Sequence, residues 1–171
     1  VASAFGTEEP IPLDAGLPSF SGVTRFSWSP DGTRIAFTCD RQIDGQFELY
    51  VAAAGGVAAA TKVSGSMVTA GDVTLFEWSP DGTQLAFLAD KIVDQRVEVF
   101  VTRPDFVGEP VAVSGAMPNA GDALDFAWSS EGTRIGFRAD LVVDQQFDVF
   151  VANRDGIGGP QPIGVLAGNG E

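Results

Sequence analysis

Aspartates at regular spacing are the residues of this chain that are best suited to chemistry. Two carboxylates stand four residues apart, and the pair returns every 50 residues, at 40–44, 90–94 and 140–144. A further aspartate follows glycine in the segments 70–72 and 120–122. Ca²⁺ prefers several carboxylate and carbonyl oxygens as ligands, so the recurring set predicts a calcium site. Its candidate ligands are Asp40, Asp44, Asp72, Asp90, Asp94, Asp122, Asp140 and Asp144.

The same aspartates have a second interpretation, in which they cap loops. Short acidic side chains accept hydrogen bonds from nearby backbone N–H groups, and exposed carboxylates keep a loop end soluble. The sequence contains no Asp-x-Asp-x-Asp-Gly run of the kind found in known calcium loops. Calcium binding and loop capping both stay open at this point.

Other residue types argue against catalysis. The chain contains no histidine, which excludes Ser-His-Asp and Cys-His machinery within it. Cys39 is the single cysteine and lies in the apolar run 35–39, so we expect a buried structural thiol. Glu48, Glu98 and Asp148 recur between apolar neighbours, and this alternation predicts exposed strand residues. We therefore expect no catalytic residues and no enzyme.

The charge of the chain restricts its partners. It has 23 acidic and 10 basic residues and a net charge of -13. Such a surface repels the phosphates of nucleic acids and of anionic membranes. No stretch approaches the roughly 18 apolar residues of a membrane helix. We expect neither nucleic-acid binding nor membrane insertion.

A repeated motif indicates which elements position the aspartates. The run Phe-x-Trp-Ser-Pro-Asp-Gly-Thr begins at Phe26 and returns at Phe76. Phe126 begins a third copy, in which Ser130-Glu131 replaces Pro-Asp. A fixed period of 50 residues indicates one supersecondary unit copied in tandem.

Each copy contains four predicted strands. In the middle copy these are 73–78, 84–88, 97–101 and 110–113, and a Ser-Pro-Asp-Gly turn joins the first two. No apolar period of 3.6 residues is sustained, so the fold class is all-β. Four strands repeated by rotation predict β-propeller blades, because solenoid coils are shorter than 50 residues.

The connections of such a blade determine where the aspartates lie. Each strand of a meander reverses direction, so the loops between second and third strands share one end with the crossovers between repeats. The eight candidate ligands all lie in these two classes of connection. The recurring tryptophans are expected between neighbouring blades: Trp28, Trp78 and Trp128.

The repeated residues resemble the repeat of TolB-like β-propellers. The resemblance rests on Trp-Ser-Pro-Asp-Gly-Thr, followed by Ile-Ala-Phe or Leu-Ala-Phe and by Glu-Leu-Tyr-Val at 48–51 or Glu-Val-Phe-Val at 98–101. Related repeats occur in the propeller domains of prolyl-oligopeptidase-like enzymes. The resemblance implies a WSPDGT-type blade and, with the acidity of the chain, an extracellular or periplasmic location.

The number of blades is the unusual feature. We predict an N-terminal segment at 1–22, with a surplus outer-strand-like stretch at 10–14, and blades at 23–66, 67–116 and 117–171. A closed propeller typically needs four to eight blades, so three four-stranded antiparallel repeats form a partial propeller or part of an oligomeric assembly.

Open blade faces and strand edges favour association. Isologous pairing of two chains would close a six-bladed ring, the blade number of the TolB-like resemblance. Head-to-tail contacts would give a ring or an open filament. A third alternative is a fragment of a longer protein whose other blades lie elsewhere.

The function that follows is a non-enzymatic interaction or structural scaffold that self-associates, with calcium pinning its loops. The alternative is a fragment of the substrate-gating propeller of a prolyl-oligopeptidase-like hydrolase, which needs a separate domain with a Gly-x-Ser-x-Gly elbow. A glycosidase that uses carboxylates alone is disfavoured, because the repeated acids are symmetric rather than differentiated.

Overall fold

A computed structural model of the chain describes residues 21–56, 58–118, 121–143 and 145–163. These residues form twelve strands and no helix, in three four-stranded antiparallel sheets. They therefore contain no helix that is long and apolar enough to cross a membrane. The predicted all-β fold of tandem four-stranded blades is confirmed.

Each sheet is built from consecutive strands in chain order, and we name it a blade. Blade 1 contains β1 (Val23–Trp28), β2 (Arg34–Cys39), β3 (Glu48–Ala53) and β4 (Thr61–Lys62). Blade 2 contains β5 (Val73–Trp78), β6 (Leu85–Ala89), β7 (Glu98–Thr102) and β8 (Val111–Ala112). Blade 3 contains β9 (Ala123–Trp128), β10 (Arg134–Val143), β11 (Gln146–Asn153) and β12 (Gln161–Pro162). The surplus outer-strand-like stretch predicted at 10–14 lies outside the described residues.

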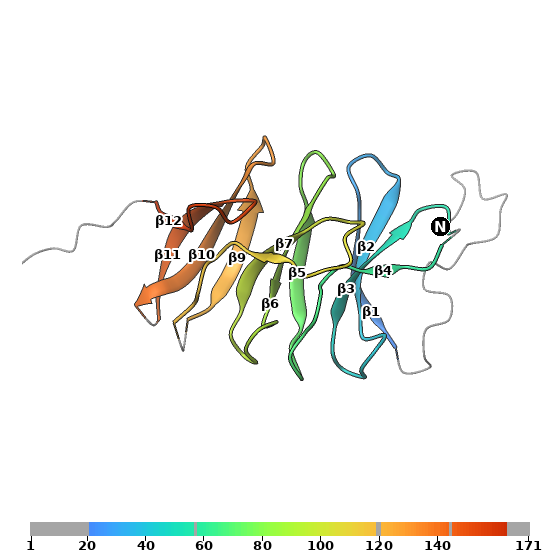
Figure 1. Ribbon diagram of the computed structural model, residues 1–171, viewed down its shortest axis with the longest axis horizontal. Coiled ribbons are helices and arrows are strands. Elements are labelled where there is room, and N and C mark those ends of the chain that lie inside the picture. Colours follow the sequence, from blue (N-terminus) through green and yellow to red (C-terminus); the bar gives the residue numbers. More distant parts are fainter. Residues whose placement is uncertain (1–20, 57, 119–120, 144, 164–171) are drawn as a thin grey trace, which may run out of the picture.

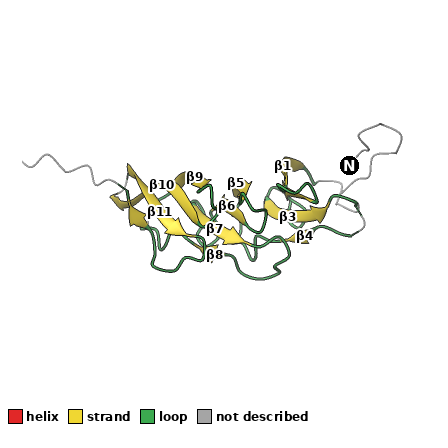
Figure 2. Ribbon diagram, turned by 90° about the horizontal axis from the view of Figure 1, so that it is seen from above, coloured by secondary structure: helices red, strands yellow, loops and turns green. Residues whose placement is uncertain are grey.

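The three blades stand side by side along the longest axis of the molecule (Figures 1 and 2). We call the face of a blade that looks toward the next blade in the chain its front, and the opposite face its back. The front of blade 1 packs on the back of blade 2 through Ala36, Leu49 and Val51 on one side and Phe76 and Trp78 on the other. Burial of each large apolar side chain contributes about 1.5–3 kcal/mol, so these junctions hold the blades together.

The junction between blades 2 and 3 repeats this packing with the equivalent residues. Leu88, Val99 and Val101 on the front of blade 2 meet Phe126 and Ile135 on the back of blade 3. Stacked aromatic pairs lie within each blade, as in Phe87 with Phe100 at a ring separation of 5.4 Å.

Trp78 and Trp128 lie at the junctions between blades, as the repeat predicts, whereas Trp28 does not. The Trp78 indole N–H donates to the Ser27 carbonyl at 3.3 Å, and the Trp128 indole N–H donates to the Glu77 carbonyl at the same distance. Trp78 is 9% exposed, whereas Trp28, on the back of blade 1, is 45% exposed.

The predicted turn between first and second strands is also confirmed. In blade 1 the Gly32 N–H donates to the Ser29 carbonyl at 2.9 Å, and Gly32 has a φ of 68° that suits glycine. The Asp31 carboxylate accepts bonds from the Ser29 hydroxyl and the Thr33 N–H at 2.6 and 3.0 Å. These bonds lower the pKa of Asp31 to about 2.

The third copy keeps this turn despite its different residues. Ser129 and Gly132 make the same backbone bonds, while the Glu131 carboxylate accepts a bond from the Ser130 hydroxyl instead. The positive φ at Gly132, 65°, is retained. Backbone geometry therefore sustains the hairpin where Pro-Asp is missing.

The expectation that Glu48 and Glu98 are exposed is wrong, because both side chains are buried. Alternation identifies an exposed side chain only where one face of the sheet meets solvent, and β3 and β7 are buried along both faces. Asp148, the equivalent residue of blade 3, is half-buried. Cys39 is fully buried, as predicted.

Candidate functional site

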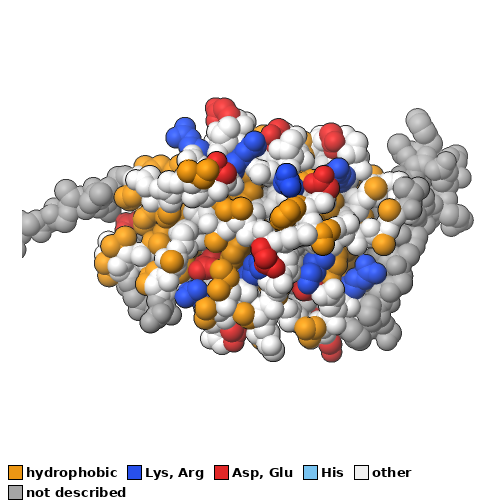
Figure 3. All heavy atoms as spheres, viewed as in Figure 1, with side chains coloured by type: hydrophobic (Ala, Val, Ile, Leu, Met, Phe, Trp, Pro, Cys, Tyr) orange, Lys and Arg blue, Asp and Glu red, His pale blue; other side chains and the backbone are white. Residues whose placement is uncertain are grey.

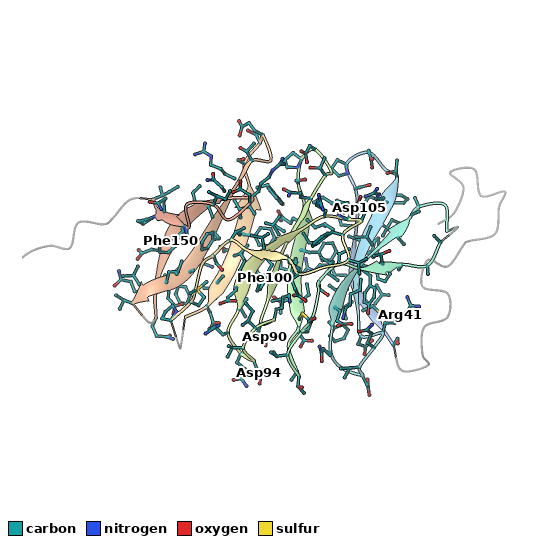
Figure 4. The ribbon with its side chains drawn as sticks, in the orientation of Figure 1. Arg41, Asp90, Asp94, Phe100, Asp105 and Phe150 are labelled. Atoms are coloured by element: carbon teal, nitrogen blue, oxygen red, sulfur yellow. The ribbon has the colours of Figure 1, made fainter. Side chains whose placement is uncertain are left out.

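The recurring aspartates gather at one end of the blades, as strand parity predicts. The β2–β3 and β6–β7 connections and the crossovers between blades meet there (Figure 1). Figure 4 shows Asp90 and Asp94 on the β6–β7 connection at this end, away from Phe100 in the body of the blade. Asp44 and Asp94 are exposed, and Asp144 lies outside the described residues.

One class of aspartate directly follows the second strand in blades 1 and 2 and lies within β10 in blade 3, and all three side chains are buried. In each blade one carboxylate oxygen accepts a backbone N–H from the loop five residues on, where the chain turns through a positive φ. The pairs are Asp40 with Gly45 at 3.2 Å, Asp90 with Gln95 at 3.0 Å and Asp140 with Gln145 at 3.0 Å. These aspartates close their own loops.

The other oxygen of the same carboxylates holds the incoming crossover. Asp90 accepts the N–H of Asp72, and Asp140 accepts the N–H of Asp122, both at 2.5 Å. The glycine that precedes each crossover aspartate allows this approach, since a Cβ at Gly71 would lie 2.6 Å from the Asp90 carbonyl oxygen. The Gly-Asp pair of each crossover thus has a steric cause.

The crossover aspartates bind the preceding blade. The Asp72 carboxylate accepts the N–H of Phe47 at 2.7 Å, and the Asp122 carboxylate accepts the N–H of Val97 at 2.8 Å. We call each of these hydrogen bonds an aspartate latch. The residue after each latch adds a backbone bond to the same partner, from the Val73 N–H to the Phe47 carbonyl at 2.8 Å. Polar bonds and the apolar junction therefore fasten the same pair of blades.

Blade 1 differs at its own entry. Gly22 occupies the crossover position, and its N–H donates to Asp40 at 2.6 Å. Glycine has no carboxylate, so it cannot form a latch to a blade on the back of blade 1. The sequence shows that glycine replaces aspartate here. Only the structure shows that this aspartate binds the preceding blade in the other two crossovers.

The surroundings of these aspartates shift their pKa values in opposite directions. Burial raises the pKa of Asp72, and the charges of Asp90 and Asp94 raise it further, against the bond from Phe47. The N–H groups of Gly22 and Gly45 lower the pKa of Asp40. Backbone N–H groups therefore hold the carboxylates at this end of the molecule in place.

The capping interpretation of these aspartates is confirmed for five residues: Asp40, Asp72, Asp90, Asp122 and Asp140. Within the described part of the chain, which lacks Asp144, no three side chains of Asp, Glu, Cys or His are grouped to hold a metal ion. Oxygens that already accept short N–H bonds have fewer lone pairs to offer a cation. Calcium binding by the full set stays a prediction.

A second polar cluster was missed by the sequence reasoning. Glu48 binds the Lys62 ammonium group at 2.7 Å and accepts the Tyr50 hydroxyl bond at 2.8 Å. Burial and the Glu48 carboxylate raise the pKa of Tyr50 well above its usual range. A signal was available, because Tyr50 stands opposite Lys62 in the register of β3 and β4, and Glu48 lies two residues before Tyr50 on the same face of β3.

Glu98 occupies the same position in blade 2 without these partners. Phe100 replaces the tyrosine and Ala112 replaces the lysine, and the remaining ion pair is with Arg96 at 3.4 Å. Glu98 Oε2 has no hydrogen-bond partner among the described residues. Burial raises the pKa of Glu98, against the attraction of Arg96 and the Met117 N–H. The two glutamates are therefore equivalent in position and opposite in environment.

We expect the variants Glu48→Gln and Glu98→Gln to change stability in opposite directions at pH 7. Glu48→Gln removes a buried ion pair and lowers the free energy of unfolding by about 2 kcal/mol. Glu98→Gln removes a charge whose ionisation opposes folding, so the free energy of unfolding rises. Urea unfolding of both variants measures the difference.

The stability gained in Glu98→Gln depends on pH. Because the folded pKa of Glu98 lies above its usual 4.5, the penalty is absent below pH 4.5 and develops as pH rises from there to the folded pKa. The advantage of Glu98→Gln should vanish below that window. An advantage that persists at lower pH would contradict the assignment.

We expect Asp122→Ala to lower the free energy of unfolding by about 1–2 kcal/mol, because it leaves the Val97 N–H without its acceptor. The matched control is Asp94→Ala, an exposed aspartate at the same end, which should change stability by less than about 0.5 kcal/mol. Equal effects in urea unfolding would show that the latch contributes nothing.

Solved structures share the fold. A putative TolB from Agrobacterium tumefaciens matches with a TM-score of 0.56 and 21% identity, over 88% of this chain and 50% of that chain. A puromycin-hydrolyzing peptidase from Mycobacterium tuberculosis matches with a TM-score of 0.59 and 20% identity, over 88% of this chain and 24% of that chain. Prolyl oligopeptidase B from Galerina marginata matches with a TM-score of 0.57 and 14% identity, over 83% and 22%.

This chain spans half the length of the first of these structures and about a quarter or less of the peptidases. No curated protein is significantly similar to it. The family model described as the lipoprotein LpqB β-propeller domain matches residues 24–140, which include blade 1 from its second residue, all of blade 2 and the start of blade 3. Because that match extends over more than half of the chain, the protein belongs to the lipoprotein LpqB β-propeller domain family.

Proposed function

We propose that this chain is a non-enzymatic β-propeller module of the cell envelope, extracellular or periplasmic, that acts as an interaction or structural scaffold. The observation that carries this proposal is the exposure of apolar side chains in the first strand of blade 1 and on the front of blade 3. Val23, Phe26 and Trp28 are exposed on the back of blade 1, and Val149 and Ile163 are exposed in blade 3. Exposed apolar patches are typical of protein interaction sites.

The family supports the location, and the repeat supports the type of blade. The matched domain is described as that of a lipoprotein, and a structure described as a putative TolB shares the fold. We propose on this basis that Trp-Ser-Pro-Asp-Gly-Thr is a TolB-like repeat and that the protein works at the envelope. The absence of histidine from the sequence excludes Ser-His-Asp machinery within these blades.

Self-association is the most concrete form of this function, and its partners are further copies of the chain. Two faces that bury apolar side chains elsewhere in the molecule favour contact with protein over solvent. The net charge of -13 works against such contact at low salt, because like-charged copies repel one another.

The alternative is a propeller that gates substrate entry to a hydrolase domain. It is favoured by the peptidases among the solved structures that share the fold. It requires a catalytic domain with a Gly-x-Ser-x-Gly elbow joined to this propeller. A gene that encodes such a domain beside these blades would decide for this alternative.

Light scattering across a range of concentrations tests the scaffold proposal. We expect oligomers whose share grows with concentration and with salt, because salt screens the repulsion between acidic copies. A mass of 17.8 kDa under all conditions would contradict self-association.

Calcium stabilisation is tested by calorimetry and thermal unfolding. A calcium site at this end predicts a saturable heat and a raised Tm, and loss of both in Asp94→Ala would place the site on the β6–β7 loop. No heat and an unchanged Tm would contradict calcium binding and leave loop capping as the role of these carboxylates.

A further inference from the structure

We infer that residues 10–17 of this chain cover the back of blade 1, as residues 60–67 cover the back of blade 2 and residues 110–117 cover that of blade 3. We call each of these three stretches a cover segment. The first of them lies outside the described residues, whereas the face that it would cover lies within them. The proposed scaffold function does not depend on this contact.

The back of blade 1 is buried along β2 and β3. Five apolar side chains form a core cluster there, and none is more than 8% exposed: Ile35, Phe37, Cys39, Tyr50 and Ala52. Among the described residues, the one partly buried apolar side chain packed against this cluster is Ala60. An alanine cannot cover two aromatic rings, and a sheet buries an apolar face only against a second layer. The back of blade 1 therefore has more cover than the described residues supply.

An end of the row of blades does not become buried without a cover. On the front of blade 3, Val149 is 48% exposed, whereas Leu49 and Val99 at the same position are fully buried against the next blade. Ile163, whose N–H binds the Val149 carbonyl, is 56% exposed. Figure 3 shows hydrophobic side chains gathered at the end of the molecule where β11 and β12 lie. The two ends of the molecule thus differ in their cover.

The first strand of blade 1 is not covered, and this pattern identifies the type of cover. Phe26 and Trp28 lie on the same face as the cluster but are 69% and 45% exposed. At the internal junctions the equivalent indole binds the first strand of the preceding blade, as Trp78 binds the Ser27 carbonyl. A cover segment contains a fourth strand and no first strand, so it leaves Phe26 and Trp28 exposed. A whole neighbouring blade would bury both.

The two described cover segments show which side chains make the contact. In the cover of blade 2, Val63 is fully buried in the same core as Phe87, and Met67 packs against that core. In the cover of blade 3, Val113 and Met117 are buried in the core of the junction. Each cover therefore presents two apolar side chains that are four residues apart.

The sequence before blade 1 repeats this apolar pair in register. Leu13 stands 50 residues before Val63, and Leu17 stands 50 residues before Met67. Pro10 stands 100 residues before Pro110. Because the repeat has a fixed period of 50 residues, these positions are equivalent. The first cover segment thus carries both of the side chains that the contact requires.

The chain enters blade 1 at the point from which a cover segment has to run. The N–H of Gly22 donates to Asp40 at 2.6 Å, as the equivalent crossover N–H groups do in blades 2 and 3. Leu17 precedes Gly22 by five residues, which is the spacing between Met67 and Asp72. The segment therefore has the length to reach the place on blade 1 that the internal covers reach on their blades.

Cys39 lies on the covered face and is the single cysteine of the chain, so its labelling by iodoacetamide measures the opening of the cover. Leu13→Asp places a charge in the apolar contact. It should raise the labelling rate, followed by mass spectrometry, at least about tenfold, because burial of a leucine contributes more than the free energy of a factor of ten. An unchanged rate in Leu13→Asp would overturn the inference, as would rapid labelling of the unmodified chain.

The matched control is Ile11→Asp in the same segment, because Val111 at the equivalent position is 43% exposed. This variant should label at the rate of the unmodified chain. Circular dichroism checks that each variant is folded, and Leu17→Ser replaces Leu13→Asp if the latter is not.

A thiol in another blade distinguishes loss of this cover from general destabilisation. Cys39→Ala combined with Ala89→Cys moves the cysteine to the equivalent position of blade 2, where Ala89 is fully buried in the same core as Val63. Leu13→Asp should not change the labelling of this thiol. Equal acceleration at both positions in a folded chain would contradict the inference.

A second copy of the chain is the alternative cover, and concentration separates the two. Protection by the chain's own segment does not depend on concentration. A labelling rate that rises when the unmodified chain is diluted would assign the cover to a second copy and overturn the inference. Such a result would support the proposed self-association, so the two can fail separately.

Discussion

The structure depends on one constraint, which is that a blade of this type must be covered on both of its faces. Its second and third strands are apolar on each side, and neither side alone makes a complete core. Blade 2 satisfies the constraint completely, because it lies between two neighbours. The outer blades have a neighbouring blade on one face only, and side chains of β1 and β11 are exposed on the other, although the β2 and β3 side chains on the back of blade 1 are buried.

At the end where the aspartates gather, polar groups also join each blade to its neighbour. Each crossover has to bring its backbone close to the preceding blade, where N–H groups would otherwise be buried without partners. Asp72 and Asp122 satisfy these donors, and Asp90 and Asp140 satisfy those of the crossover itself. A pattern of carboxylates that resembles a cation site is thus explained by the backbone of a repeated fold.

Much of this fold could be predicted from the sequence, because strands and turns are specified by residues that are close together in the chain. The Trp-Ser-Pro-Asp-Gly-Thr run contains a strand end and a turn, and its period counts the blades. The burial of Glu48 and Glu98 could not be read in the same way, because alternation within a strand does not show whether a face of the sheet is covered. The bonding of Asp122 to Val97 was likewise hidden, since strand alternation within a blade says nothing about the register between blades. Parity predicted the end at which the aspartates lie, but only the packing of blades identified their partners.

The different environments of Glu48 and Glu98 bear on how a chain of near-identical repeats avoids misfolding. Tandem copies invite a third strand to pair with the fourth strand of the wrong copy, which is a common failure of repeat proteins. If β3 paired with β8 instead of β4, Glu48 would exchange the Lys62 ammonium group for Ala112 and bury an unpaired charge. Divergence at these few positions therefore distinguishes the copies, because only the pairing of β3 with β4 gives Glu48 the Lys62 ammonium group.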